Sequence, residues 1–79
     1  MAEYKLELTI EASKSCTENP SARLSLILLE MKSGDKLEVV GEDLYFRYDM
    51  LKEILIAQGL EIVEDEYDGL TYRIVAVKP

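Results

Sequence analysis

The chain carries one side chain that stands out for chemistry, the thiol of Cys16, which is its single cysteine. It has no histidine, and so it lacks the commonest general base, proton shuttle and metal ligand. One cysteine also excludes an internal disulfide and any multi-cysteine zinc or iron–sulfur site. A thiol that only accepts and passes on a group needs no base of its own, because its partner supplies the second half of the reaction. The composition therefore predicts thiol chemistry without a metal or cofactor, and not a stand-alone enzyme.

The position of Cys16 supports an exposed and reactive thiol. It lies in a polar stretch, residues 11–19, three residues before Asn19-Pro20. Asn as N-cap with Pro at the first helical position predicts the start of a helix. The unpaired N–H groups and partial positive charge of a helix N-terminus favour a thiolate. A buried structural cysteine is the alternative, and the polar neighbours argue against it.

The elements that would position this thiol follow from hydrophobic periodicity. Residues 4–10 alternate between apolar and polar, which is typical of a half-buried strand. Apolar residues at helical spacing predict helices from residue 20 to Ser33-Gly34 and from 44 to 58, with Gly59 after the second. Strands are expected at 35–40, 60–67 and 70–77, the last two joined by an Asp68-Gly69 turn. This βαβαββ order predicts an α+β two-layer sandwich, a mixed four-stranded sheet with two helices on one face.

Several of these segments together resemble the TusA/SirA family of small sulfur-carrier proteins. The resemblance lies in Cys16-Thr17-Glu18-Asn19-Pro20, the helix that follows, and Ser33-Gly34-Asp35 leading into Leu37-Glu38-Val39-Val40. It extends to the second helix, its Gly59, and the strand Leu60-Glu61-Ile62-Val63, so residues 1–79 are expected to form one such domain. The resemblance implies the two-layer sandwich and a sulfurtransferase-like carrier. Cys16 would bear a persulfide, and Asn19 and Pro20 would support it at the helix N-terminus.

The motif around Cys16 departs from that of the family. The family carries Cys-Pro-x-Pro, whereas this chain has Thr17 after the cysteine and its proline one residue later, at Pro20. Two functions therefore stay open. The first is a carrier that takes sulfane sulfur from a donor protein and relays it to an acceptor protein. The alternative is a non-catalytic interaction or regulatory domain of the same fold that has lost the sulfur chemistry.

The first predicted helix has a second apolar stripe, formed by Ala22, Leu26 and Leu29, opposite its expected core face. Such a stripe is either covered by the second helix or exposed as a surface for a partner or a homodimer. The aromatic residues at the start of the second helix, Tyr45, Phe46 and Tyr48, are interpreted as core.

Charge and hydropathy exclude several other partners. The formal net charge of −7 would repel nucleic acid and anionic membranes. The longest apolar run is Leu26 to Leu29, and the N-terminus has no signal-peptide pattern, so a cytoplasmic protein is expected. The acidic residues near the last turn match no calcium-loop spacing and are interpreted as a solvated edge, namely Glu61, Glu64, Asp65, Glu66 and Asp68.

Overall fold

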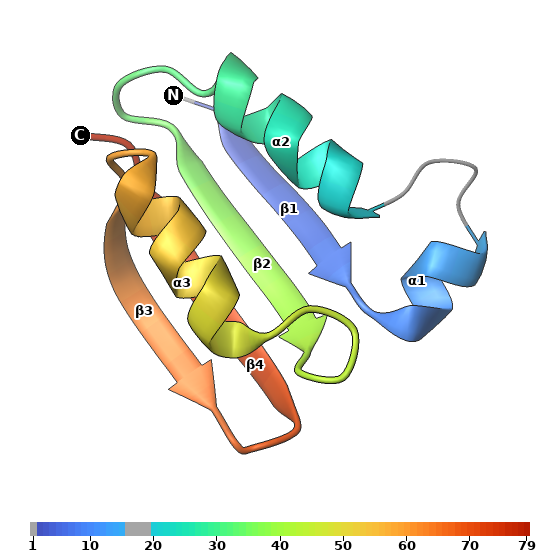
Figure 1. Ribbon diagram of the computed structural model, residues 1–79. Helices are drawn as coiled ribbons and strands as arrows, with labels where there is room; N and C mark the ends of the chain where they lie inside the picture. The colour runs from blue at the N-terminus through green and yellow to red at the C-terminus, as the bar shows by residue number, and fades with distance from the viewer. Residues whose placement is uncertain (1, 16–19) are drawn as a thin grey trace.

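The computed structural model describes residues 2–15 and 20–79 of the chain. In chain order, its elements are β1 (Glu3–Leu8), α1 (Ile10–Ser15), α2 (Pro20–Glu30), β2 (Lys36–Glu42), α3 (Tyr48–Ala57), β3 (Glu61–Tyr67) and β4 (Thr71–Val77). The strands form one mixed sheet, and α2 and α3 lie together on one of its faces (Figure 1). The predicted α+β two-layer sandwich is therefore confirmed.

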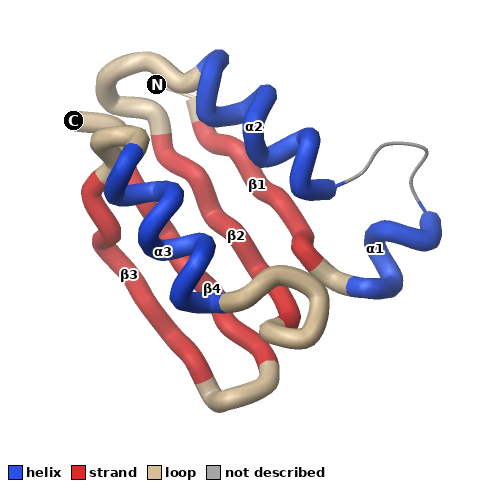
Figure 2. The backbone as a smooth tube through the Cα atoms, viewed as in Figure 1, coloured by secondary structure: helices blue, strands red, loops and turns tan. Residues whose placement is uncertain are grey.

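The strand order is β1-β2-β4-β3. β1 and β2 are parallel, as the α2 crossover requires, and β4 is antiparallel to both of its neighbours. β4 thus lies between β2 and β3, and the tube in Figure 2 shows the two edge strands, β1 and β3, on either side of this central pair. Tyr48 begins α3 on the β3 side, whereas α2 packs along β1.

The core lies between the helices and the sheet. Burial alternates along β1 and β2, so that Leu6 and Leu8 of β1 and Leu37 and Val39 of β2 face the helices. The rest of the buried cluster lies on or next to the two longer helices and on β4, namely Leu24, Ile27, Met31, Leu51, Leu55, Leu60, Tyr72, Ile74 and Ala76. Within the described part of the chain, no helix covers the opposite face of the sheet, and its side chains are mostly charged.

Two of the predicted boundaries rest on backbone signals that the structure confirms. α2 begins at Pro20, where the Asn-Pro pair predicts it. α3 ends in a Schellman motif, because Gly59 N donates to Ile56 O at 2.9 Å and Leu60 N donates to Leu55 O at 3.0 Å. Gly59 takes a φ of 84°, which an L side chain rarely adopts.

Two segments differ from the sequence-based expectation. The polar stretch after β1 was expected to be a loop, but its first part forms the short helix α1, with Glu11 in its first turn and Lys14 in its last. The Glu42 side chain stabilises this start, since the N–H of Ile10 donates to Glu42 Oε1 at 2.9 Å. α3 begins at Tyr48 instead of residue 44, with Arg47 as its N-cap in an extended conformation. The Asp43 carboxylate accepts a hydrogen bond from the first helical N–H, Tyr48 N, at 3.0 Å.

Candidate functional site

In the sequence, the expected thiol site falls between α1 and α2. α1 ends at Ser15 and α2 starts at Pro20, so Cys16 directly follows one helix in the sequence and precedes the next by four positions. Cys16 and Asn19 themselves lie outside the described residues. Pro20 is at the first position of α2, as expected for the residue that starts the supporting helix.

The two faces of α2 differ sharply in exposure. Leu24 and Ile27 are buried against the sheet, with only 3% and 7% of their surface exposed. On the opposite side Leu26 is 53% exposed and Leu29 is 82% exposed, and Ala22 is exposed one turn earlier. The sequence left open whether α3 covers this stripe. The structure shows that it does not, so Ala22, Leu26 and Leu29 form an outward apolar surface.

A polar and aromatic cluster joins the start of α3 to the edge strand β3. The Tyr48 ring stacks on Tyr67 with 4.2 Å between centroids and 10° between planes. The Tyr48 hydroxyl donates to Asp65 Oδ1 at 2.5 Å, and Lys52 Nζ lies 2.9 Å from Asp65 Oδ2. The Lys52 ammonium, followed by the Tyr48 hydroxyl, lowers the pKa of Asp65. The hydrogen bond to Asp65 likewise raises the pKa of Tyr48.

This cluster refines two interpretations of the sequence. Tyr45, Phe46 and Tyr48 pack half-buried against the core, which agrees with the expected role of the aromatics. Asp65 was grouped with the solvated acidic edge; it is exposed, and it also links β3 to α3 through Tyr48 and Lys52. The sequence signal would have been the spacing of Tyr48 and Lys52, which places both on one side of α3.

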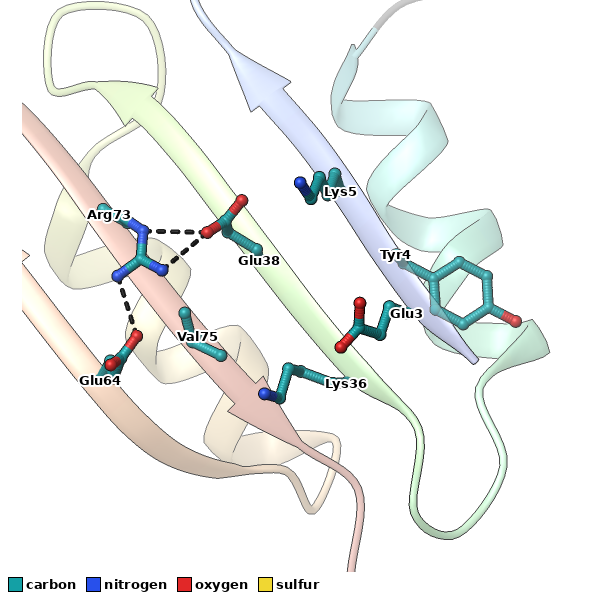
Figure 3. A pocket seen from close by; sticks show the side chains of 8 residues that line it. All are labelled: Glu3, Tyr4, Lys5, Lys36, Glu38, Glu64, Arg73 and Val75. Atoms are coloured by element: carbon teal, nitrogen blue, oxygen red, sulfur yellow. Dashed lines mark hydrogen bonds and ion pairs between the residues drawn. The ribbon is translucent and has the colours of Figure 1, made fainter. Parts of the chain in front are cut away.

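The open face of the sheet has a second charged cluster, centred on Arg73 (Figure 3). Its guanidinium donates from Nε to Glu38 Oε2 of β2 at 2.9 Å and from Nη1 to Glu64 Oε2 of β3 at 2.9 Å. These carboxylates, Glu64 first, raise the pKa of Arg73. Glu64 is exposed, as expected for the solvated edge, and through Arg73 it is also linked across β4 to Glu38 of β2.

Beside Arg73 lies a shallow hollow of about 230 Å³. Val75 forms its floor, while Lys5 and Lys36 stand opposite acidic neighbours across the strands (Figure 3). Acidic and basic side chains alternate around it, which is typical of a solvated sheet face with cross-strand charge pairs. The hollow therefore provides no convergent set of groups for a ligand of one charge.

Within residues 2–15 and 20–79, no group of three or more acidic or thiol side chains is placed to hold a metal ion. In the same part of the chain, no helix has the length and apolarity needed to cross a membrane. Comparison with protein-family models, with curated proteins and with solved structures finds no significant match to this chain.

Proposed function

We propose that this protein is a small sulfur carrier in which Cys16 accepts sulfane sulfur as a persulfide and relays it to a partner protein. The observation that carries the proposal is the order of elements around the thiol. Strand β1 and the short helix α1 lead to the segment with Cys16, and a helix beginning at Pro20 follows. Apart from α1, this order of strands and helices in a two-layer sandwich is the one that the resemblance to the TusA/SirA family implies.

The transfer needs only thiol exchange. The Cys16 thiolate attacks the outer sulfur of a donor persulfide, an S–S bond forms on Cys16, and the donor leaves as a thiolate. In the second step an acceptor thiolate attacks the outer sulfur on Cys16, which leaves as a thiolate again. Each step breaks one S–S bond and forms another, so no outside oxidant or reductant is required. No histidine is needed, which suits this composition.

Mass spectrometry of the intact protein tests the proposal. Incubation with a persulfide donor is expected to add about 32 Da per chain, the mass of one sulfur atom, and a thiol reductant should remove it. Cys16→Ser should abolish the gain. A protein that stays at its original mass with several chemically different donors is not a sulfur carrier.

The exposed stripe on α2 favours a second candidate function. Leu26 and Leu29 are exposed side by side on a helix whose opposite face is already buried, which is typical of a surface that contacts another protein. Thr17 replaces the proline of the family motif, as expected if the thiol chemistry is lost. On this proposal the protein is a non-catalytic interaction domain. Complex formation should then persist in Cys16→Ser and be lost in Leu26→Glu.

A further inference from the structure

The strand β3 lies at an edge of the sheet, and the outer side of its backbone is open. In the order β1-β2-β4-β3 it pairs with β4 alone, and in the part of the chain that the structure describes no strand lies on its other side (Figure 2). Ile62 is half-buried, and the other residues of the strand are exposed. A β-bulge between Ile62 and Glu64 leaves residues 64–67 as the regular part of this edge. Such an edge presents N–H and C=O groups to which another extended chain can pair.

The hairpin fixes which backbone groups of β3 point outwards. Asp68 N donates to Thr71 O at 3.1 Å, so the backbone of Asp68 faces β4. Bonded and non-bonded positions alternate along an antiparallel pair, so the backbone of Glu66 faces β4 as well. Asp65 and Tyr67 therefore turn their N–H and C=O groups away from the sheet.

The charge of this edge decides what kind of strand can pair with it. Every charged side chain in residues 61–72 is acidic. Glu64 and Glu66 lie on the open face, where Arg73 Nη1 is 2.9 Å from Glu64 Oε2 and 3.9 Å from Glu66 Oε1. The Glu66 side chain is nevertheless 75% exposed. A second copy of β3, or any acidic strand, would bring like charges opposite one another, whereas a strand with Lys or Arg at these places forms favourable cross-strand pairs.

A hollow beside the regular part of the edge can hold a side chain of the added strand. It has a volume of about 330 Å³, and its lining includes the apolar Val40, the ring of Tyr67 and the carboxylates of Glu66 and Asp68. Arg73 also lines it, but its guanidinium is already bound by two carboxylates. A residue opposite Glu66 projects to the same face of the sheet as Glu66. A Lys or Arg side chain there can lay its alkyl chain in the hollow and place its charge beside the carboxylate.

We propose that residues 64–67 of β3 bind an extended segment of a partner protein, in which Lys or Arg alternates with apolar residues, as an added strand of the sheet. The backbone groups of Asp65 and Tyr67 supply the hydrogen bonds, and the carboxylates of Glu64 and Glu66 select the basic side chains. The proposal rests on neither of the two functions above and does not involve Cys16. The contact is much smaller than the roughly 800 Å² per partner of a standard interface, so the isolated segment binds weakly, with a dissociation constant of about 0.1–1 mM.

Amide hydrogen exchange measured by NMR tests the pairing, with a synthetic heptapeptide of alternating Lys and Val as the probe. At about ten times its dissociation constant, the peptide should slow the exchange of the Asp65 and Tyr67 amides about 10-fold, because these amides then exchange only from the unbound protein. The same peptide with N-methylated Val residues keeps its charge but loses the N–H groups that face β3. It should leave the exchange of both amides unchanged.

Two variants with the same change of charge test the position of the site. Glu66→Lys should weaken peptide binding roughly 3- to 10-fold, since it replaces an attractive cross-strand pair by a repulsive one. Glu7→Lys, on the exposed side of the other edge strand β1, is the matched control. It should leave binding unchanged at about 0.15 M ionic strength, where charges more than about 8 Å apart are largely screened.

Three results would overturn the proposal. They are unchanged exchange of Asp65 and Tyr67 with the peptide, equal slowing by the N-methylated peptide, and equal weakening by Glu66→Lys and Glu7→Lys. The persulfide assay detects a mass gain on Cys16 without any peptide, so its result is independent of these outcomes.

Discussion

Gly41 and Tyr72 are cross-strand partners in β2 and β4, and a Cβ atom on Gly41 would lie 2.5 Å from the Tyr72 hydroxyl oxygen. Tyr72 is 3% exposed, and its hydroxyl donates to the carbonyl of Phe46 at 2.7 Å. The ring therefore lies across the glycine and reaches the segment that leads into α3. This contact connects the centre of the sheet to the start of that helix.

Replacing Gly41 with alanine should destabilise the fold. The added methyl group overlaps the Tyr72 ring, so the ring must shift and its bond to Phe46 must weaken, at a cost of about 1–3 kcal/mol. Urea unfolding followed by circular dichroism measures the loss. Val40→Ala, one position along the same strand on the open face, is the control. If the two variants lose the same free energy of unfolding, Tyr72 does not hold the position described here.

Asp35 should make the protein sensitive to acid. Its buried carboxylate accepts hydrogen bonds from Ala2 N and Lys32 N, both at 2.9 Å, and these bonds, Ala2 first, lower its pKa. A carboxyl with a lowered folded-state pKa stabilises the protein above its unfolded value of about 3.9, and this stabilisation is lost as the pH falls through the folded value.

Asp35→Asn is the variant that isolates this effect. Its free energy of unfolding should be lower than that of the unmodified protein at neutral pH, and the two curves should converge as the pH falls below about 3.9. Glu53→Gln, on the exposed side of α3, serves as the control. Parallel curves for the Asp35 variant and the unmodified protein across this range would contradict the prediction.

Tyr72 should produce a separate loss of stability at alkaline pH. Burial raises the pKa of Tyr72 to about 12, with a smaller contribution from the Asp43 carboxylate. The phenol ionises near pH 10 in the unfolded chain, so the higher pKa in the folded state stabilises the protein fully below about pH 10, and this stabilisation is lost as the pH rises towards 12.

Tyr72→Phe should lower the free energy of unfolding by about 1 kcal/mol at neutral pH, because the Phe46 carbonyl loses its hydrogen-bond donor. The variant should also lose less stability at alkaline pH than the unmodified protein. Unfolding curves and tyrosinate absorbance measure both effects, and an equal alkaline loss in the two proteins would refute the assignment.

Arg73 should stabilise the sheet in a salt-dependent way. It bridges Glu38 and Glu64 on the two neighbouring strands, within a face rich in carboxylates. Arg73→Gln removes both bridges and leaves the acidic side chains to repel one another, so the variant should be least stable at low ionic strength and should recover partly in high salt. Lys5→Gln removes the same charge from the same face and serves as the control. A destabilisation that does not change with salt would rule out the electrostatic explanation.

Short-range signals in the sequence predict much of the fold. The Asp68-Gly69 turn forms as expected, because the Asp68 carboxylate accepts hydrogen bonds from Leu70 N and Thr71 N and Gly69 adopts a φ of 101°. The start of α2 at Pro20 and the helical spacing of its buried residues Leu24 and Ile27 are equally local. The helix α1 was missed because its stabilising contact comes from Glu42, which is 32 positions away from Ile10.

Alternation and helical spacing predicted the four strands and the two longer helices and which residues of each are apolar, because these periods follow from backbone geometry. The composition, with its single cysteine, made Cys16 the candidate for thiol chemistry. Only the tertiary structure decided that β4 enters between β2 and β3, and that Arg73 therefore joins Glu38 to Glu64. The same is true of the exposure of Leu26 and Leu29. Whether a side chain is covered depends on where distant segments pack, and that is settled by the balance of burial over the whole chain instead of by any local pattern.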